Sequence, residues 1–98
     1  MAAMNDNQVR LHRNGAVCDC IKVSQQGARK RWNAGQGVWM VNKAREGRET
    51  PDYIHHDASV KFTETVEQFR YWHCGYGMGN DVTFYVTRDK EGGSHVLK

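Results

Sequence analysis

The stretch VRLHRNGAVCDC, residues 9–20, constrains the fold more than any other part of the chain. Asn14 and Gly15 stand between two extended segments and suit the two positive-φ positions of a type I′ turn. Such a turn joins two antiparallel strands into a tight hairpin. We therefore expect an antiparallel sheet that begins with this hairpin.

The register of the predicted hairpin follows from its two-residue loop, because the loop fixes which residues pair across it. Alternation along the two strands then places four small or apolar side chains on one face, which we expect to lie in the core. These residues are Val9, Leu11, Cys18 and Cys20. On the other face, Arg10 and Asp19 are expected to form a cross-strand ion pair.

The remaining elements are short. We predict strands at residues 38–42 and 82–87, an extended segment at 59–63, and polar connections at 24–36 and 43–52. The segment 24–36 has no sustained hydrophobic period, so we interpret it as a loop with at most one helical turn.

One short helix is expected over residues 65–74. Thr65 and Gln68 have the spacing of a capping box, and the apolar residues that follow share a helical face until Gly75. The residues of that face are Val66, Phe69, Trp72 and His73. The same stretch also fits a strand with alternate residues on one side, so the helix competes with this alternative.

The predicted fold class is α+β, mostly β: a small antiparallel sheet that opens with the N-terminal hairpin, and one short helix packed on it. Ten Val against two Leu and two Ile favour strands, because β-branched side chains suit a pleated surface. The 98 residues fit a single small domain, 1–98, with loose tails at 1–7 and 88–98.

No apolar run approaches the roughly 20 residues that a membrane helix needs, and the N-terminus lacks the features of a secretory signal. We therefore expect a cytoplasmic protein that does not bind membranes. Charge is uneven, since residues 1–50 carry nine Lys or Arg against four Asp or Glu. This excess permits an anionic partner such as nucleic acid or a nucleotide.

The segment GARKRWNAGQGVW, residues 27–39, is the best candidate for a binding site. Guanidinium groups pair with phosphates, and an exposed indole can stack on a base. The candidate binding residues are Arg29, Lys30, Arg31 and Trp32, with help from Arg10 and Arg13. In the alternative interpretation these cations are merely solvated, and Trp32 packs over the edge of the domain while Trp39 lies in the core.

Residues 29–41 resemble part of a family of small phage anti-defence proteins that sequester nucleotide-derived immune signals. That family has an Arg-x-Gly-Trp-Asn-Gly stretch entering an apolar strand, and the matching residues are Arg29, Trp32, Asn33, Gly35 and the strand 38–41. Arg31 stands where the family has glycine, Ala34 is an insertion, and a hairpin replaces the family's N-terminal helix. The resemblance implies a pocket for a small phosphorylated ligand.

Cysteine and histidine side chains are the usual zinc ligands, but their spacing does not predict a zinc site here. Neighbouring side chains of an extended chain point apart, which applies to three pairs. The pairs are Cys18 with Cys20, His55 with His56, and His73 with Cys74. We expect no metal, no cofactor and no catalytic residues.

A second candidate surface is the aromatic stretch FRYWHCGY, residues 69–76. A small core needs only some of these rings, so at least one should be exposed as an anchor for a protein partner. The candidate residues are Phe69, Tyr71, Trp72 and Tyr76. We thus expect a non-enzymatic module that binds nucleic acid or a nucleotide. The alternative is a small protein-interaction inhibitor or adaptor, such as a phage-encoded anti-defence protein that binds a host protein or a nucleotide signal. The oligomeric state is left open.

Overall fold

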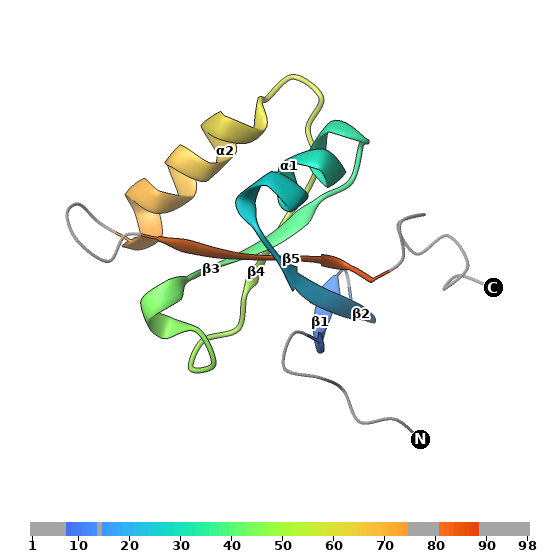
Figure 1. Ribbon diagram of the computed structural model, residues 1–98, viewed down its shortest axis with the longest axis vertical. Coiled ribbons are helices and arrows are strands. Elements are labelled where there is room, and N and C mark those ends of the chain that lie inside the picture. Colours follow the sequence, from blue (N-terminus) through green and yellow to red (C-terminus); the bar gives the residue numbers. More distant parts are fainter. Residues whose placement is uncertain (1–7, 14, 75–80, 89–98) are drawn as a thin grey trace.

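The computed structural model describes residues 8–13, 15–74 and 81–88, and its fold is α+β, mostly β. One antiparallel sheet has the strand order β1-β2-β5-β3-β4. The strands are β1 (Gln8–Arg13), β2 (Ala16–Val23), β3 (Val38–Asn42), β4 (Asp52–Ile54) and β5 (Val82–Thr87). The helices are α1 (Gln25–Asn33) and α2 (Phe62–Phe69), with a short 3₁₀ turn η1 (Lys43–Arg45) and a π turn η2 (Arg70–Cys74). Figure 1 shows α1 and α2 on the same side of the sheet.

The predicted hairpin is confirmed with its register. Leu11 pairs with Cys18, and Arg10 pairs with Asp19 across the two strands. The Arg10 and Asp19 side chains approach to 3.4 Å, as expected. Gly15 has φ +84°, in the left-handed region that a type I′ turn requires, while Asn14 lies outside the described residues.

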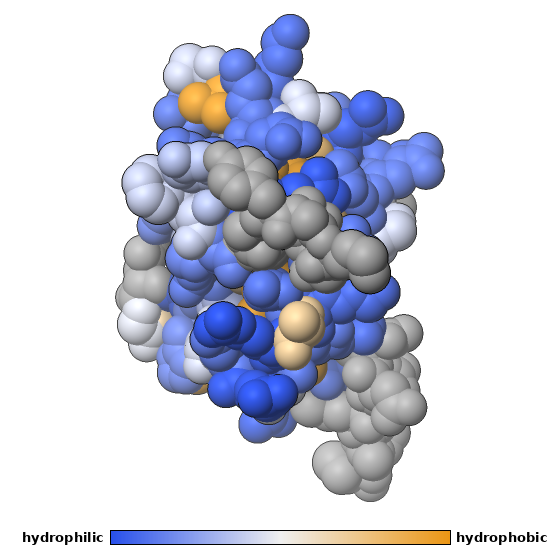
Figure 2. All heavy atoms as spheres, turned by 90° about the vertical axis from the view of Figure 1, so that its left-hand side faces the viewer, coloured by the Kyte–Doolittle hydropathy of each residue, from blue (hydrophilic) through white to orange (hydrophobic). Residues whose placement is uncertain are grey.

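The sheet is buried on both faces. Between the helices and the sheet lies one apolar cluster: Ala28, Trp32, Val38, Met40, Phe62, Val66, Phe69, Phe84 and Val86. On the other face lies a second: Leu11, Cys18, Cys20, Trp39, Val41 and Tyr85. Consecutive residues of β3 and β5 therefore alternate between two cores. Figure 2 shows that one side of the molecule is mostly hydrophilic, with apolar side chains only in small separate areas.

The prediction of a loop at 24–36 is wrong, because residues 25–33 form α1. The Ser24 side chain caps this helix by accepting a hydrogen bond from the backbone N–H of Gly27 (3.1 Å). Ala28 and Trp32, four residues apart, are its buried residues. The sequence pattern missed the helix because its apolar stripe is only these two side chains wide, and every other position is polar or glycine.

The prediction of a helix near 65–74 is confirmed, but α2 begins at Phe62, so the extended segment predicted at 59–63 is wrong. The reason is the cap: the backbone N–H of Lys61 donates to the Glu64 carboxylate (3.0 Å), one half of a capping box that lies before the one expected at Thr65. Trp72, predicted on one helical face with Val66 and Phe69 and also as a candidate anchor for a protein partner, is 69% exposed.

The predicted loose tails at the two ends of the chain lie mostly outside the described residues. The tail 1–7 and the glycine-rich segment 75–80 lie outside the described residues, as does most of the predicted C-terminal tail. Arg88, the first residue of that tail, donates its backbone N–H to the Asp19 carbonyl (2.9 Å). Within the described ranges, no helix is long and apolar enough to cross a membrane.

The connection after β3 is anchored to the sheet by Glu46. Its carboxylate accepts hydrogen bonds from Lys22 Nζ (2.7 Å), Thr83 Oγ1 (3.1 Å) and the Tyr85 hydroxyl (3.4 Å). The hydrogen bond from Lys22 is the largest cause that lowers the pKa of Glu46, whereas burial and then the Glu46 charge raise the pKa of Tyr85 to about 12. Ionised Glu46 therefore ties β2 and β5 to this connection.

This anchor predicts a pH dependence. Because the folded pKa of Glu46 is depressed, its contribution to stability is present above its ordinary pKa of about 4.5 and is lost as the pH falls through the folded value. We expect the difference in unfolding free energy between the parent and Glu46→Gln to be larger near neutral pH than at acid pH, in urea titrations. Glu49→Gln is the control from the same connection, because Glu49 makes only an exposed pair with Arg45. A difference that does not change with pH would contradict the anchor.

Candidate functional site

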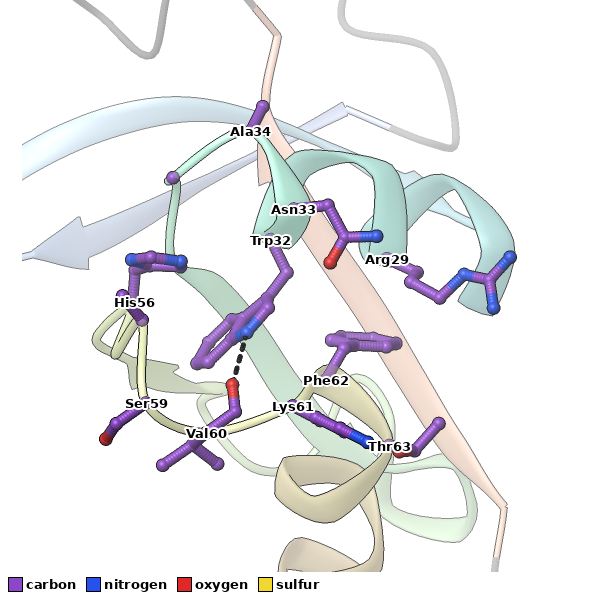
Figure 3. Close-up of a pocket in the computed structure, with 12 residues that line it drawn as sticks. Arg29, Trp32, Asn33, Ala34, His56, Ser59, Val60, Lys61, Phe62 and Thr63 are labelled. Atoms are coloured by element: carbon purple, nitrogen blue, oxygen red, sulfur yellow. Dashed lines mark hydrogen bonds between the residues drawn. The ribbon is translucent and has the colours of Figure 1, made fainter.

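A hollow of about 710 Å³ lies between α1, the loop that follows it, and the segment that leads into α2 (Figure 3). Its lining residues are Arg29, Trp32, Asn33, Ala34, Gly35, His56, Ala58, Ser59, Val60, Lys61, Phe62 and Thr63. Volumes of a few hundred to a thousand cubic ångströms are typical of small-molecule sites. We call this feature the main hollow.

Two cations and a histidine lie at the rim of the main hollow. Arg29 comes from α1, Lys61 precedes α2, and His56 follows β4; Arg29 and Lys61 are exposed and His56 is half-buried. Figure 3 shows Arg29 and His56 on opposite sides of Trp32. None of the described residues that line the hollow carries a carboxylate. The rim therefore favours a negatively charged ligand.

Trp32 forms the floor of the main hollow. The side chain is 2% exposed, and its indole N–H donates to the Val60 carbonyl (3.0 Å). Its ring lies 5.0 Å from the His56 ring and 6.1 Å from the Phe62 ring, measured between centroids. The hypothesis of an exposed, stacking Trp32 is therefore wrong, because the helix turns the indole inward and both neighbours cover it.

The end of α1 gives the hollow its shape. Gly35 has φ +95°, its N–H donates to the Trp32 carbonyl (2.9 Å), and the N–H of Gln36 donates to the Arg31 carbonyl (3.0 Å). These two bonds form a Schellman motif, which needs a residue such as glycine in the left-handed conformation. The chain thus turns back into β3 beneath the hollow.

A tight turn forms the opposite wall. The Asp57 carboxylate accepts hydrogen bonds from the backbone N–H and the hydroxyl of Ser59 (2.9 and 2.7 Å). The hydrogen bond from the Ser59 hydroxyl is the largest cause that lowers the pKa of Asp57. Asp57 is therefore engaged by its own turn, next to His56 in the chain, and does not line the hollow.

The three consecutive cations of the sequence do not form one surface. Arg29 lines the main hollow. Lys30 is exposed and lines neither the main hollow nor a second, smaller hollow that shares the loop after α1 with it. Arg31 is half-buried, and its guanidinium donates to the Thr87 carbonyl (2.7 Å). Arg31 thus fastens α1 to the end of β5, which gives it a structural role in place of the predicted contact with a ligand.

The two hairpin arginines point in different directions. Arg10 lies on the face of β1 away from the second apolar cluster and pairs with Asp19. Arg13 is half-buried, and its guanidinium lies over the Tyr53 ring, 5.8 Å from the ring centroid. Neither arginine lines the main hollow; Arg13 lines a neighbouring, smaller hollow that shares Ala34, Gly35 and His56 with it.

The aromatic stretch is divided between core and surface. Phe69 is buried and stacks on His73, whereas Tyr71 and Trp72 are 54% and 69% exposed and form a T-shaped pair (ring centroids 5.1 Å apart). Tyr76 lies outside the described residues. Within the described residues, Tyr71 and Trp72 are the exposed members of the predicted set, so these two rings can contact a partner.

Cys18 and Cys20 are buried free thiols, as their place on the hairpin predicts. Burial raises the pKa of Cys20 to about 12, so this thiol stays protonated and unreactive near neutral pH. Among the described residues, no three His, Cys, Asp or Glu side chains gather closely enough to hold a metal ion.

Sequence reasoning missed Lys61 and His56 as members of this site. In the sequence His56 is a candidate only as a metal ligand, and Lys61 stands between Val60 and Phe62 with no other cation next to it. Both are brought to Arg29 by the packing of Trp32, which no local pattern reveals.

Comparisons with protein-family models, with curated proteins and with solved structures find no match to this chain. The similarity of residues 29–41 to phage anti-defence proteins therefore stays a prediction. Four of the residues that carry it line the main hollow: Arg29, Trp32, Asn33 and Gly35.

The burial of Trp32 predicts that two tryptophan substitutions change the free energy of unfolding by very different amounts. Trp32→Ala should lower the free energy of unfolding by ~3–5 kcal/mol, because it removes a core ring and leaves the Val60 carbonyl without its donor. Trp72→Ala, the matched control at an exposed position, should change it by less than about 0.5 kcal/mol. Urea unfolding of both variants measures this difference, and equal losses would show that the two positions are packed alike.

Proposed function

We propose that the protein is a non-enzymatic binding module whose main hollow binds the phosphate of a nucleotide or nucleic acid. The observation that carries the proposal is the meeting of Arg29, Lys61 and His56 around one hollow whose described lining contains no carboxylate. Arg29 belongs to α1, whereas Lys61 and His56 lie on the segment between β4 and α2, so their convergence is a property of the fold and not of a charge run in the sequence.

The chemistry of the lining fits a phosphate ester. A guanidinium such as that of Arg29 can pair with two phosphate oxygens, while an ammonium such as that of Lys61 acts as a point charge. Asn33, Ser59 and Thr63 add neutral hydrogen-bonding groups to the lining. The buried rings below supply an apolar floor for the rest of the ligand.

A charge-matched pair of variants on one helix tests this proposal. Arg29→Gln should weaken binding of single-stranded oligothymidylate by about tenfold to a hundredfold, because it removes a charged hydrogen bond worth ~1.5–3 kcal/mol. It should also reduce the salt dependence of binding by about 0.7 in the log–log slope if one phosphate contact is lost. Lys30→Gln removes the same charge from an exposed position outside the hollow and should change neither quantity.

Fluorescence anisotropy titrations at two salt concentrations measure both quantities. Absence of binding by the parent, or equal effects of Arg29→Gln and Lys30→Gln, would reject the main hollow as a phosphate site. Thermal melts of both variants should match the parent, because both side chains are exposed.

A second candidate function is favoured by the exposure of Tyr71 and Trp72, which lie in η2 directly after α2. Large exposed rings are enriched at the centres of protein interfaces. We propose this pair as an anchor for a protein partner if the main hollow does not bind an anion.

This second candidate predicts a partner that depends on Trp72. After nuclease treatment, a protein that binds the parent should lose affinity for Trp72→Ala by tenfold or more, since anchor residues contribute about 2 kcal/mol or more. Val17→Ala is the control, because Val17 is another exposed apolar side chain and lies on the hairpin. Equal binding of the parent and Trp72→Ala would exclude the pair as an anchor.

A further inference from the structure

A smaller hollow of about 390 Å³ adjoins the main hollow. Its described lining residues are Arg13, Ala34, Gly35, Gln36, Gly37, Tyr53, His56 and Thr87. Ala34, Gly35 and His56 line both hollows. The two therefore meet at the loop that follows α1.

The boundary between the hollows is low. Ala34 and Gly35 present only a methyl group and a hydrogen there, and a Cβ built on Gly35 would meet no atom within 4 Å. A chain-like ligand can therefore pass over this loop without displacing a side chain. His56, half-buried against Trp32, stands beside both hollows.

The smaller hollow has its own cation. Arg13 is held by its contact with the Tyr53 ring. Gln36 and Thr87 line the same hollow and are bonded to Arg31. As in the main hollow, no described lining residue is a carboxylate. Two cationic sites thus lie on either side of one low loop.

We infer that the two hollows form a single track for a single-stranded nucleic-acid segment, with one phosphate at Arg29 and Lys61 and a later phosphate at Arg13. This inference rests on the proposed function of the main hollow and adds the class of ligand. A mononucleotide places its phosphate in one of the two hollows only. A strand of linked nucleotides places phosphates in both hollows and gains affinity from the second contact.

The track holds the backbone and does not read the bases. Tyr53 has Arg13 over its ring and Trp39 packed against it at 4.6 Å, and Trp32 is covered by its neighbours. These rings are therefore not free to stack on successive bases. Binding should be governed by length and salt, with little preference for sequence.

The test compares thymidine monophosphate with oligothymidylate as competitors for a labelled oligothymidylate, using the parent, Arg13→Gln, Arg10→Gln and Arg29→Gln. The parent should bind the oligomer at least about tenfold more tightly than the monophosphate. Arg13→Gln should lose most of this gain and leave the monophosphate affinity unchanged. Arg10→Gln, the control from the same strand, should keep the gain, because Arg10 pairs with Asp19 away from both hollows.

The two proposals fail in different ways. If the monophosphate binds and depends on Arg29, but the oligomer binds no more tightly and Arg13→Gln has no effect, the track is wrong while the main hollow stands as a phosphate site. If neither ligand binds the parent, both proposals are wrong. Arg13→Lys is the control for a loss of folding in Arg13→Gln. It keeps the positive charge, so it should retain most of the tighter binding of the oligomer relative to the monophosphate if Arg13 contacts a phosphate.

Discussion

The candidate site depends on the hydrogen bond from the Trp32 indole to the Val60 carbonyl (3.0 Å). A buried indole N–H needs an acceptor, and this one belongs to the segment that leads into α2. The bond and the packing of the ring against His56 and Phe62 hold α1, that segment and α2 in one arrangement. Together with the apolar cluster on the sheet, this contact places Arg29 and Lys61 at the same hollow.

Trp39 has a similar role on the opposite face of the sheet. It is fully buried, and its indole N–H donates to the His12 carbonyl (3.0 Å), which fastens the end of β1 to the second apolar cluster. The residue that follows His12 in β1 is Arg13, whose guanidinium lies over the Tyr53 ring. Each tryptophan therefore positions a cation at the edge of a hollow, Trp32 through packing of a helix and Trp39 through the end of a strand.

The sequence predicts the parts of the fold that depend on local chemistry. The hairpin is such a part, because its turn and alternation determine the pairing confirmed between Leu11 and Cys18. The sequence did not predict helix α1, because its buried stripe consists of only two side chains, Ala28 and Trp32. The helix is stabilised by packing these side chains on the sheet, which no local pattern shows. Of the three rim residues, the sequence predicted only Arg29 as a binding residue. Its convergence with Lys61 and His56 depends on contacts between residues far apart in the chain.

The fate of the basic run Arg29, Lys30 and Arg31 follows from the helix that contains it. Each step along a helix turns the side chain by about 100°, so three consecutive cations cannot face one ligand. One enters the rim of the main hollow, one faces solvent, and one bonds to the carbonyl of Thr87. A charge run is concentrated in sequence but dispersed in space once it becomes helical. The rim instead combines Arg29 of α1 with Lys61 from the segment before α2. Lys30 has the same charge as Arg29, lies on the same helix and does not line the hollow, so it is a control for Arg29.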